Sequence, residues 1–331
     1  MTEQRATSQS DPLDHESVVS FIVEEHDKRL DRVVSEHIPD LSRTQGQRLI
    51  ESAQVTVNGR PRKPAYRVTP GERVTVTLPQ EEPEVAVRPE PIPLDIIYED
   101  EHLVVVNKPA GMVVHPAPGH PDGTLVNALL AHCPPIAEAG LRERVGIVHR
   151  LDKDTSGVLV VAKDENTLRA LHEQFRNREV KKTYLALVRG RVQPPEGIIE
   201  VPIGRDPRDR QRMKALPEGR YARTRYCAVE FFRKHTLLEA HPYTGRTHQV
   251  RVHLSWLGYP VVGDSRYGPR RQRLLKERHF LHAHRLGFTH PATGEEMTFE
   301  APLPTELDDV VRRLRPAPPP KDASRFVSHN R

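Results

Sequence analysis

Two aspartates lie two positions apart in a short charged stretch, His149-Arg150-Leu151-Asp152-Lys153-Asp154-Thr155-Ser156-Gly157. Apolar runs at Val145–Val148 and Val158–Ala162 flank this stretch and are typical of core strands. A carboxylate between two such strands is costly unless it is paired or takes part in chemistry. The pattern therefore predicts either a carboxylate that acts as an acid, base or nucleophile, or a loop cap that is paired with Arg150 and Lys153.

A phosphotransferase is one alternative, because Asp152-x-Asp154-Thr155 matches the start of haloacid-dehalogenase enzymes. In that class the first aspartate is a nucleophile and magnesium bridges to phosphate. Two observations count against it. His149-Arg150 stand where an apolar strand is expected, and Gly263-Asp264 is followed by Gly268 where a second aspartate is needed. The short motif alone predicts such false matches.

Length and composition predict a protein of more than one domain. The chain has 331 residues, 36% hydrophobic and 29% charged, with a formal net charge of +5. The two cysteines, Cys133 and Cys227, lie in dissimilar contexts, which excludes a disulfide framework or a zinc ribbon. We see no apolar signal-peptide core and no run of about eighteen apolar residues, so we expect a cytoplasmic protein without membrane contact.

Changes in composition along the chain predict its organisation. We expect a disordered leader at residues 1–16, a compact unit at 17–80, a proline- and glutamate-rich linker at 81–93, a larger unit at 94–310 and a disordered, proline-rich tail at 311–331. Alternating helical and strand-like patterns make the whole an α+β protein, with a small α/β unit first.

The predicted elements of the first unit are a helix from Arg29, a helix over Arg43–Ala53, and strands at Val55–Val57 and Val74–Leu78. Ser42 and Gln45 predict a capping box, and Asn58-Gly59 predicts a tight hairpin. In the larger unit we expect strands at Leu103–Val106, Ile147-Val148, Val158–Val161 and Tyr184–Val188, and helices over Leu168–Phe175 and Thr247–Leu257.

Cations gather on the predicted helices and hairpin of the first unit, where they could follow a phosphate backbone. A solvated charged face would look the same. The order of elements resembles the S-four-type RNA-binding domain, or alpha-L motif, through Arg29, Arg32, Ser42, Arg43, Ile50, Val57, Asn58, Gly59 and Pro64. The resemblance implies RNA binding, for which we expect Arg29, Arg32, Ser42, Arg43, Arg48, Arg60, Arg62 and Lys63.

The larger unit resembles the ribosomal large-subunit pseudouridine synthases, the RluA/RluD family, and its RluD branch above all. The run from Gly146 to Gly157 matches the family signature. Four further stretches match in order: Ile97–Asp100 through Asn107-Lys108-Pro109-x-Gly111-Met112-x-x-His115-Pro116, Lys182–Ala186, Thr244–His253, and Leu281-His282-Ala283 with Phe288-x-His290-Pro291. The resemblance spans about residues 94–304 and implies a mainly antiparallel mixed sheet flanked by helices and loops.

The resemblance also implies a reaction and roles for residues. Uridine in large-subunit (23S) rRNA would be flipped out, cut from its ribose and rejoined through a ring carbon, with no cofactor and no metal. Asp152 would be the essential nucleophile or base, Arg251 its partner, and Tyr184 a wall of the uracil pocket and a proton relay. Arg150 would hold the base out of the helix. Arg246 stands in the same motif as Arg251 and is the alternative partner, but it lies before the predicted helix, where we expect a phosphate contact. The expected substrate-binding residues are His149, Arg150, Arg246, His248 and Gln249.

Other possibilities remain open from the sequence. The histidines His279, His282, His284 and His290 could suggest a metal, but no acidic or cysteine ligand stands near them. The basic stretch Gly204–Lys214 is either a solvated loop or an RNA contact. The partner would be large-subunit rRNA or a pre-ribosomal particle, bound by a monomer. A binding-only ribosome-assembly factor on an inactive scaffold is the runner-up, although such a scaffold would have no need of Asp152.

Overall fold

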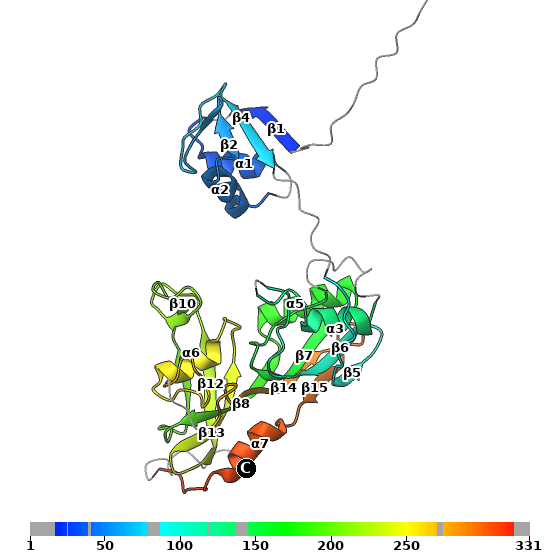
Figure 1. Cartoon of the computed structure of the whole chain (residues 1–331), viewed down its shortest axis with the longest axis vertical. Coiled ribbons are helices and arrows are strands. Elements are labelled where there is room, and N and C mark those ends of the chain that lie inside the picture. Colours follow the sequence, from blue (N-terminus) through cyan, green and yellow to red (C-terminus); the bar gives the residue numbers. More distant parts are fainter. Residues whose placement is uncertain are drawn as a thin grey trace, which may run out of the picture. The chain divides into compact units, whose positions relative to one another are not determined.

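The chain folds into two units, residues 1–86 and 87–331 (Figure 1). The computed structural model describes residues 17–24, 26–38, 41–78, 87–117, 119–134, 136, 145–269 and 274–320. The predicted leader at 1–16 lies outside the described residues. No helix in these ranges is both long enough and apolar enough to cross a bilayer.

The first unit is a four-stranded antiparallel sheet with two helices. Its elements are β1 (Ser17–Ile22), α1 (Leu30–His37), α2 (Arg43–Glu51), β2 (Val55–Val57), β3 (Arg60–Pro61) and β4 (Arg73–Leu78), and the strand order is β1-β4-β2-β3. Apolar side chains of both helices pack on the sheet in one buried cluster that includes Leu30, Val34, Ile50 and Val74. The sequence pattern did not predict β1, whose residues SVVSFI show no regular alternation of apolar and polar side chains. In the structure Val18 and Ile22 are exposed, so only part of its apolar surface packs on the core.

Local signals of the first unit acted as predicted. The Ser42 hydroxyl accepts from the Gln45 N–H, and the Gln45 side chain accepts from the Ser42 N–H at 2.9 Å, which confirms the capping box. Asn58 and Gly59 both have positive φ, at 50° and 77°, as a two-residue hairpin requires. Helix α2 ends at Glu51, two residues before the predicted end.

The second unit is built on a nine-stranded mixed sheet of order β5-β6-β7-β14-β8-β13-β12-β9, with β15 added to β14. Its strands are β5 (Ile96–Glu99), β6 (Leu103–Lys108), β7 (Ser156–Ala162), β8 (Lys181–Arg189), β9 (Glu196–Glu200), β12 (Arg223–Phe231), β13 (His235–Pro242), β14 (Leu281–Thr289) and β15 (Glu296–Glu300). The β7–β14 pair is parallel, and the remaining pairs are antiparallel. This confirms the predicted α+β class with a mainly antiparallel mixed sheet.

Helices flank the two halves of the large sheet. Helices α3 (Leu125–His132) and α5 (Glu165–Asn177) lie beside β6 and β7, while α6 (Gln249–Trp256) lies beside β12 and β13 (Figure 1). A hairpin of β10 (Ile203–Arg205) and β11 (Met213–Ala215) and the C-terminal helix α7 (Thr305–Arg313) complete the unit. The predicted basic loop at 204–214 is therefore largely this hairpin and its connection.

Gly157 makes the parallel β7–β14 contact possible. Its φ is +118°, and a Cβ added there would lie 2.2 Å from the carbonyl oxygen of Ala283. No side chain fits at that distance, so only glycine allows the two strands to approach. The last residue of the signature motif thus fixes how β7 joins β14.

Three expectations differ from the structure. Residues 147–148 form a loop with one isolated bridge from Ile147 to Val161, not a strand, because the chain turns at Gly146 to enter the site. Residues 87–93, expected within the linker, lie against the second unit, where Glu90 N–H donates to Asn127 O. Part of the expected disordered tail at 311–331 is ordered, since α7 runs to Arg313 and Ala317 N–H donates to Phe231 O, and residues 321–331 lie outside the described ranges.

Candidate active site

Asp152 lies in the loop that leads into β7, and backbone hydrogen bonds fix the turn around it. The Thr155 N–H donates to the Asp152 carbonyl at 3.0 Å, and the Gly111 N–H donates to the Lys153 carbonyl at 2.9 Å. The fully buried Lys108 ammonium donates to the carbonyls of Pro109, Met112 and Lys153. The segment 108–112 is thereby joined to the loop that carries Asp152.

Arg251, on α6, binds two carboxylates at once. Its Nη1 donates to Asp152 Oδ2 at 2.9 Å, while Nε and Nη2 donate to Asp264 at 2.7 and 3.1 Å. The Asp264 side chain is fully buried, the Arg251 side chain is 8% exposed and the Asp152 side chain is 20% exposed. Asp264 therefore holds the Arg251 guanidinium in place. Of these three linked side chains, Asp152 is the one that solvent and substrate can reach.

The electrostatics of the site keep Asp152 ionised. Burial raises the pKa of the Asp152 carboxyl, but His248 and Arg251 outweigh burial, so that its pKa lies below the usual value. Burial alone would lower the pKa of the Arg251 guanidinium, but its hydrogen bonds to Asp264 raise it. An ionised carboxylate is the form that can act as a nucleophile or base.

Tyr184 and His248 border Asp152 from two other elements. Tyr184 lies on β8, and the pKa of its phenol is raised by burial and then by the charge of Asp152. Among the described residues we find no hydrogen-bond partner for its hydroxyl. His248 precedes α6 with φ at 57°, and its Nδ1 lies 2.7 Å from the Tyr267 hydroxyl, which orients Nε2 to 3.9 Å from Asp152 Oδ1.

Asp152 opens onto a cleft of about 970 Å³. Its wall includes Tyr184, Leu281 and the segment 242–250, and its cations are Arg150, Arg176, Arg178, Lys182, Arg220 and Arg246. Burial lowers the pKa of the Arg246 guanidinium, and the positive charges of Arg220 and Arg178 lower it further. Such a cleft suits a polyanion with one base inserted.

The five predicted substrate-binding residues divide into two groups. Arg150 is exposed at the cleft with no ion pair or hydrogen bond to another described residue, and Arg246 and His248 also line it. By contrast, the His149 ring stacks on Phe175 and its Nε2 accepts from the Val160 N–H, so it serves the loop as a neutral wall residue.

Gln249 is also occupied within the protein. Its amide oxygen accepts from Thr244 and from the Arg246 N–H, and its amide nitrogen donates to Arg223 and Thr224. The side chain is 4% exposed. Contrary to the prediction of a substrate contact, this amide positions the segment 244–248 that carries Arg246 and His248.

Sequence reasoning missed Lys108, Asp264 and His279 as parts of the site. Lys108 and Asp264 stood within quoted motifs, Asn107-Lys108-Pro109 and Gly263-Asp264, but nothing in their spacing showed which atoms they would meet. Burial, with Arg278 adding to it, lowers the pKa of Lys108 to about 7. The His279 Nε2 lies 2.8 Å from the Thr155 hydroxyl, and burial lowers the pKa of His279 to about 3.

In the first unit, the predicted RNA-binding residues have two different environments. The fully buried Asp31 of α1 accepts hydrogen bonds from Arg29, Arg43 and Gln47. Arg43 and Gln47 lie on α2 and so hold α1 to α2, whereas Arg29 binds Asp31 at the start of α1 itself. Ser42 caps α2. The remaining predicted cations, Arg32, Arg48, Arg60, Arg62 and Lys63, are exposed, and Arg32 pairs with Glu36.

The predicted histidine group has other uses than a metal. His282 lies within 3.0 Å of Ser156 and Ala301 through its two ring nitrogens, and His290 pairs with Asp100. Within the described ranges, Cys227, Glu239 and His241 form a group whose ligand atoms lie within 4.8 Å of one another. Arg225 stands opposite His241 in the register of β12 and β13, so a cation lies beside this group.

Comparisons with known proteins agree with the geometry. Residues 102–256 match the family described as RNA pseudouridylate synthase, and residues 28–74 match the S4 domain. An uncharacterized RNA pseudouridine synthase of Bacillus subtilis is 47% identical over 88% of this chain and 96% of its own length. The ribosomal large subunit pseudouridine synthase D of Neisseria meningitidis is 43% identical over 87% of this chain and 79% of its own length.

A solved structure is also similar. Human RNA pseudouridylate synthase domain containing 1 has a TM-score of 0.55 and 29% identity over 71% of this chain and 93% of its own. The chain therefore belongs to the RNA pseudouridine synthase family and carries an N-terminal S4 RNA-binding domain. It is an isomerase that makes pseudouridine in RNA.

Proposed function

We propose that this enzyme converts specific uridines of large-subunit rRNA to pseudouridine. The observation that carries the proposal is the ionised Asp152, bound to Arg251 at 2.9 Å and exposed to a cleft lined by cations. Relatives named as ribosomal large subunit synthases support the choice of rRNA. The S4 domain supports RNA as the partner.

The reaction breaks the bond between ribose C1′ and uracil N1 and forms a bond between C1′ and uracil C5. The proton on C5 is lost and N1 gains one, so atoms and electrons balance without an external cofactor. Asp152 either attacks ribose C1′, which releases uracil, or attacks the uracil ring. In both routes the carboxylate must be ionised and within reach of the flipped nucleotide, as its pKa and exposure allow.

The neighbouring residues then take distinct roles. Arg150 fills the space that the flipped base leaves, since its planar side chain is free at the cleft mouth. Tyr184 covers the uracil and, because its raised pKa keeps it protonated, passes a proton during the exchange. Arg246, Arg178 and Arg220 bind phosphates on either side of the target.

The setting of the enzyme follows from the same reasoning. We place it in the cytoplasm as a monomer that acts on free rRNA or on an assembling large subunit. The first unit adds a phosphate contact through its exposed cations on α2 and the β2–β3 hairpin.

The test uses unmodified large-subunit rRNA transcribed in vitro. The full chain is incubated with it in EDTA, and pseudouridine is mapped by chemical adduct formation and primer extension. We expect discrete modified positions with the wild type and none with Asp152→Asn, which still binds the RNA. Absence of product with the wild type would refute the proposal.

The same preparations judge the alternatives, with a separate phosphatase assay in magnesium and without EDTA. Product that persists with Asp152→Asn would remove the role given to that residue. RNA binding without product would favour the assembly factor. Magnesium-dependent phosphatase activity would favour the phosphotransferase.

A further inference from the structure

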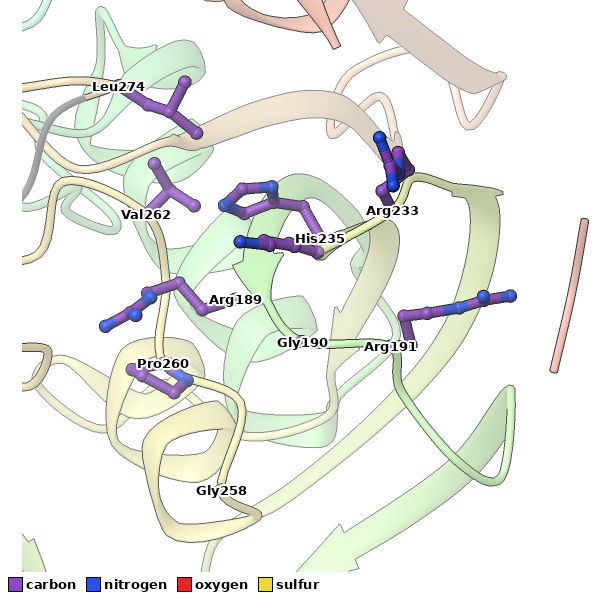
Figure 2. Close-up of a pocket in the computed structure, with 10 residues that line it drawn as sticks. Arg189, Gly190, Arg191, Arg233, His235, Gly258, Pro260, Val262 and Leu274 are labelled. Carbon is purple, nitrogen blue, oxygen red and sulfur yellow. The ribbon is translucent and has the colours of Figure 1, made fainter. Parts of the chain in front are cut away.

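A second cationic pocket lies at the far end of β8 from the active site. It has a volume of about 800 Å³ and is lined by Arg189, Gly190, Arg191, Arg233, Lys234, His235, Gly258, Pro260, Val262 and Leu274. Arg189 ends the strand on which Tyr184 lies, five residues earlier, which separates the two by ~16 Å at about 3.3 Å per residue. We call this the distal pocket (Figure 2).

The lining of the distal pocket contains three arginines, a lysine and a histidine, and no carboxylate. Figure 2 shows Arg189 extending past Pro260, with Arg191 and Arg233 on the other side of Gly190. Within the described part of the chain, none of these five residues takes part in an ion pair. The described residues therefore leave this positive charge without a paired carboxylate.

Neighbouring groups of the protein do not neutralise this charge. The carbonyls at the end of α6 are already used, since the N–H groups of Leu257, Gly258 and Tyr259 donate to them. Arg191 donates to the Pro318 carbonyl through Nη2, but its Nε is buried and has no acceptor in the described structure. The carbonyl that Arg191 meets is uncharged, so this contact leaves the positive charge of the guanidinium in place.

A positive field acts inside the pocket. Burial lowers the pKa of the His235 imidazole, and the charges of Arg189 and Lys234 lower it further. Anions are attracted to such a concave, positively charged surface. The apolar side chains of Val262 and Leu274 and the ring of Pro260 form part of the wall.

We propose that the distal pocket binds backbone phosphates of the RNA substrate, at a point remote from the modified uridine. The proposal rests on the proposed function, because it is the RNA held in the cleft that brings a second stretch of phosphates to this end of β8. The pocket would add affinity for long or folded RNA and would leave the chemical step unchanged. It would thus select structured rRNA over an isolated stem-loop.

The test compares Arg233→Gln/Lys234→Gln with a variant of the same charge change, Arg169→Gln/Arg312→Gln. Arg169 and Arg312 lie on α5 and α7, line neither pocket and are already paired with Glu165 and Asp308. Each full-length protein is tested with two RNA probes: the in-vitro large-subunit rRNA, and a short stem-loop around a uridine that the wild type modifies in it. Affinity and its salt dependence are measured by filter binding, and folding is checked by Tm.

We expect Arg233→Gln/Lys234→Gln to bind the long rRNA about tenfold more weakly, with a salt slope reduced by about 1.5. Binding and kcat with the short stem-loop should equal those of the wild type, and the control variant should lose less than twofold. Unchanged binding of the long RNA, or an equal loss with both probes, would overturn the proposal. Failure of the proposed function is distinguishable, since it removes product formation by the wild type.

Discussion

Arg251 holds Asp152 with one nitrogen and Asp264 with two, so the carboxylate that faces the cleft shares a guanidinium with a fully buried one. The Nη1 distance to Asp152 Oδ2 is 2.9 Å. The arrangement divides two tasks between two carboxylates. Asp264 stabilises the arginine, and Asp152 remains available to substrate.

Replacement of Asp264 should damage both stability and activity. Asp264→Asn leaves the buried Arg251 without its main counter-charge, and we expect the free energy of unfolding to fall by about 3 kcal/mol. Turnover should fall at least tenfold because the guanidinium no longer fixes Asp152. Asp308→Asn, which removes an exposed partner of Arg312, is the control and should cost under ~1 kcal/mol. The free energy of unfolding is measured with denaturant. An equal loss in both variants would contradict this prediction.

Tyr184→Phe should separate proton transfer from base packing. The phenol is protonated because burial and Asp152 raise its pKa, so loss of the hydroxyl should reduce kcat roughly 10²–10⁴-fold if it relays a proton. KM should change little, since the ring still covers the base. Tyr184→Leu should raise KM as well. If Tyr184→Phe turns over like the wild type, Tyr184 serves only as a wall of the pocket.

The pH dependence should report the Asp152–Arg251 pair. A carboxyl whose folded pKa is lowered stabilises the fold above its unfolded pKa, near 3.9, and loses that contribution as the pH falls through the folded pKa. Wild-type activity should therefore persist down to the lowest pH at which the protein stays folded. In Arg251→Met, the arginine no longer opposes burial, so the pKa of Asp152 should rise. The acid limb of the kcat/KM profile should then move up towards neutral pH.

Arg251→Lys provides a second variant in case Arg251→Met fails to fold. Lysine keeps the charge but cannot bind both carboxylates as a fork, so the acid limb should move by a smaller amount. Activity profiles between pH 4 and 8, with Tm at each pH, would measure this. Identical acid limbs in all three proteins would show that Arg251 does not control the ionisation of Asp152.

Gly157→Ala should disrupt the second unit. The new Cβ would lie 2.2 Å from the Ala283 carbonyl oxygen at a φ of +118°, and we expect a loss of more than about 3 kcal/mol or insoluble protein. Gly111→Ala is the matched control, because its φ is +84° but no atom lies within 4 Å of the added Cβ. It should cost about 1 kcal/mol. Similar Tm values for the two variants would contradict the packing argument.

Substitutions in the first unit should separate the cations that bind RNA from those that stabilise the fold. Arg48→Gln/Arg60→Gln/Lys63→Gln removes exposed charges and should lower rRNA affinity and reduce the salt slope by about 2, without a change in Tm. Arg43→Gln should instead lower Tm, because Arg43 binds the buried Asp31. If the triple variant binds with an unchanged salt slope, the exposed cations of this unit form only a solvated surface.

Local signals in the sequence determined much of the first unit. The Ser42–Gln45 capping box and the Asn58-Gly59 turn depend on neighbours a few residues away, so their chemistry is legible in order along the chain. Motif matching also placed Asp152, Tyr184 and Arg251 among the expected residues. The strand β1 was not singled out, because its pairing with β4 supplies order that its own composition does not.

Tertiary structure decided how the site works. Asp264 lies 112 positions after Asp152 in the chain, and Lys108 lies 44 positions before it. Only the folded structure shows that Asp264 binds Arg251 and that Lys108 donates to a carbonyl of the Asp152 loop. His149 and Gln249 stood in the right motifs, but their polar atoms are satisfied inside the protein. Sequence fixes which groups are available, whereas burial and long-range hydrogen bonds decide which of them remain free to meet a substrate.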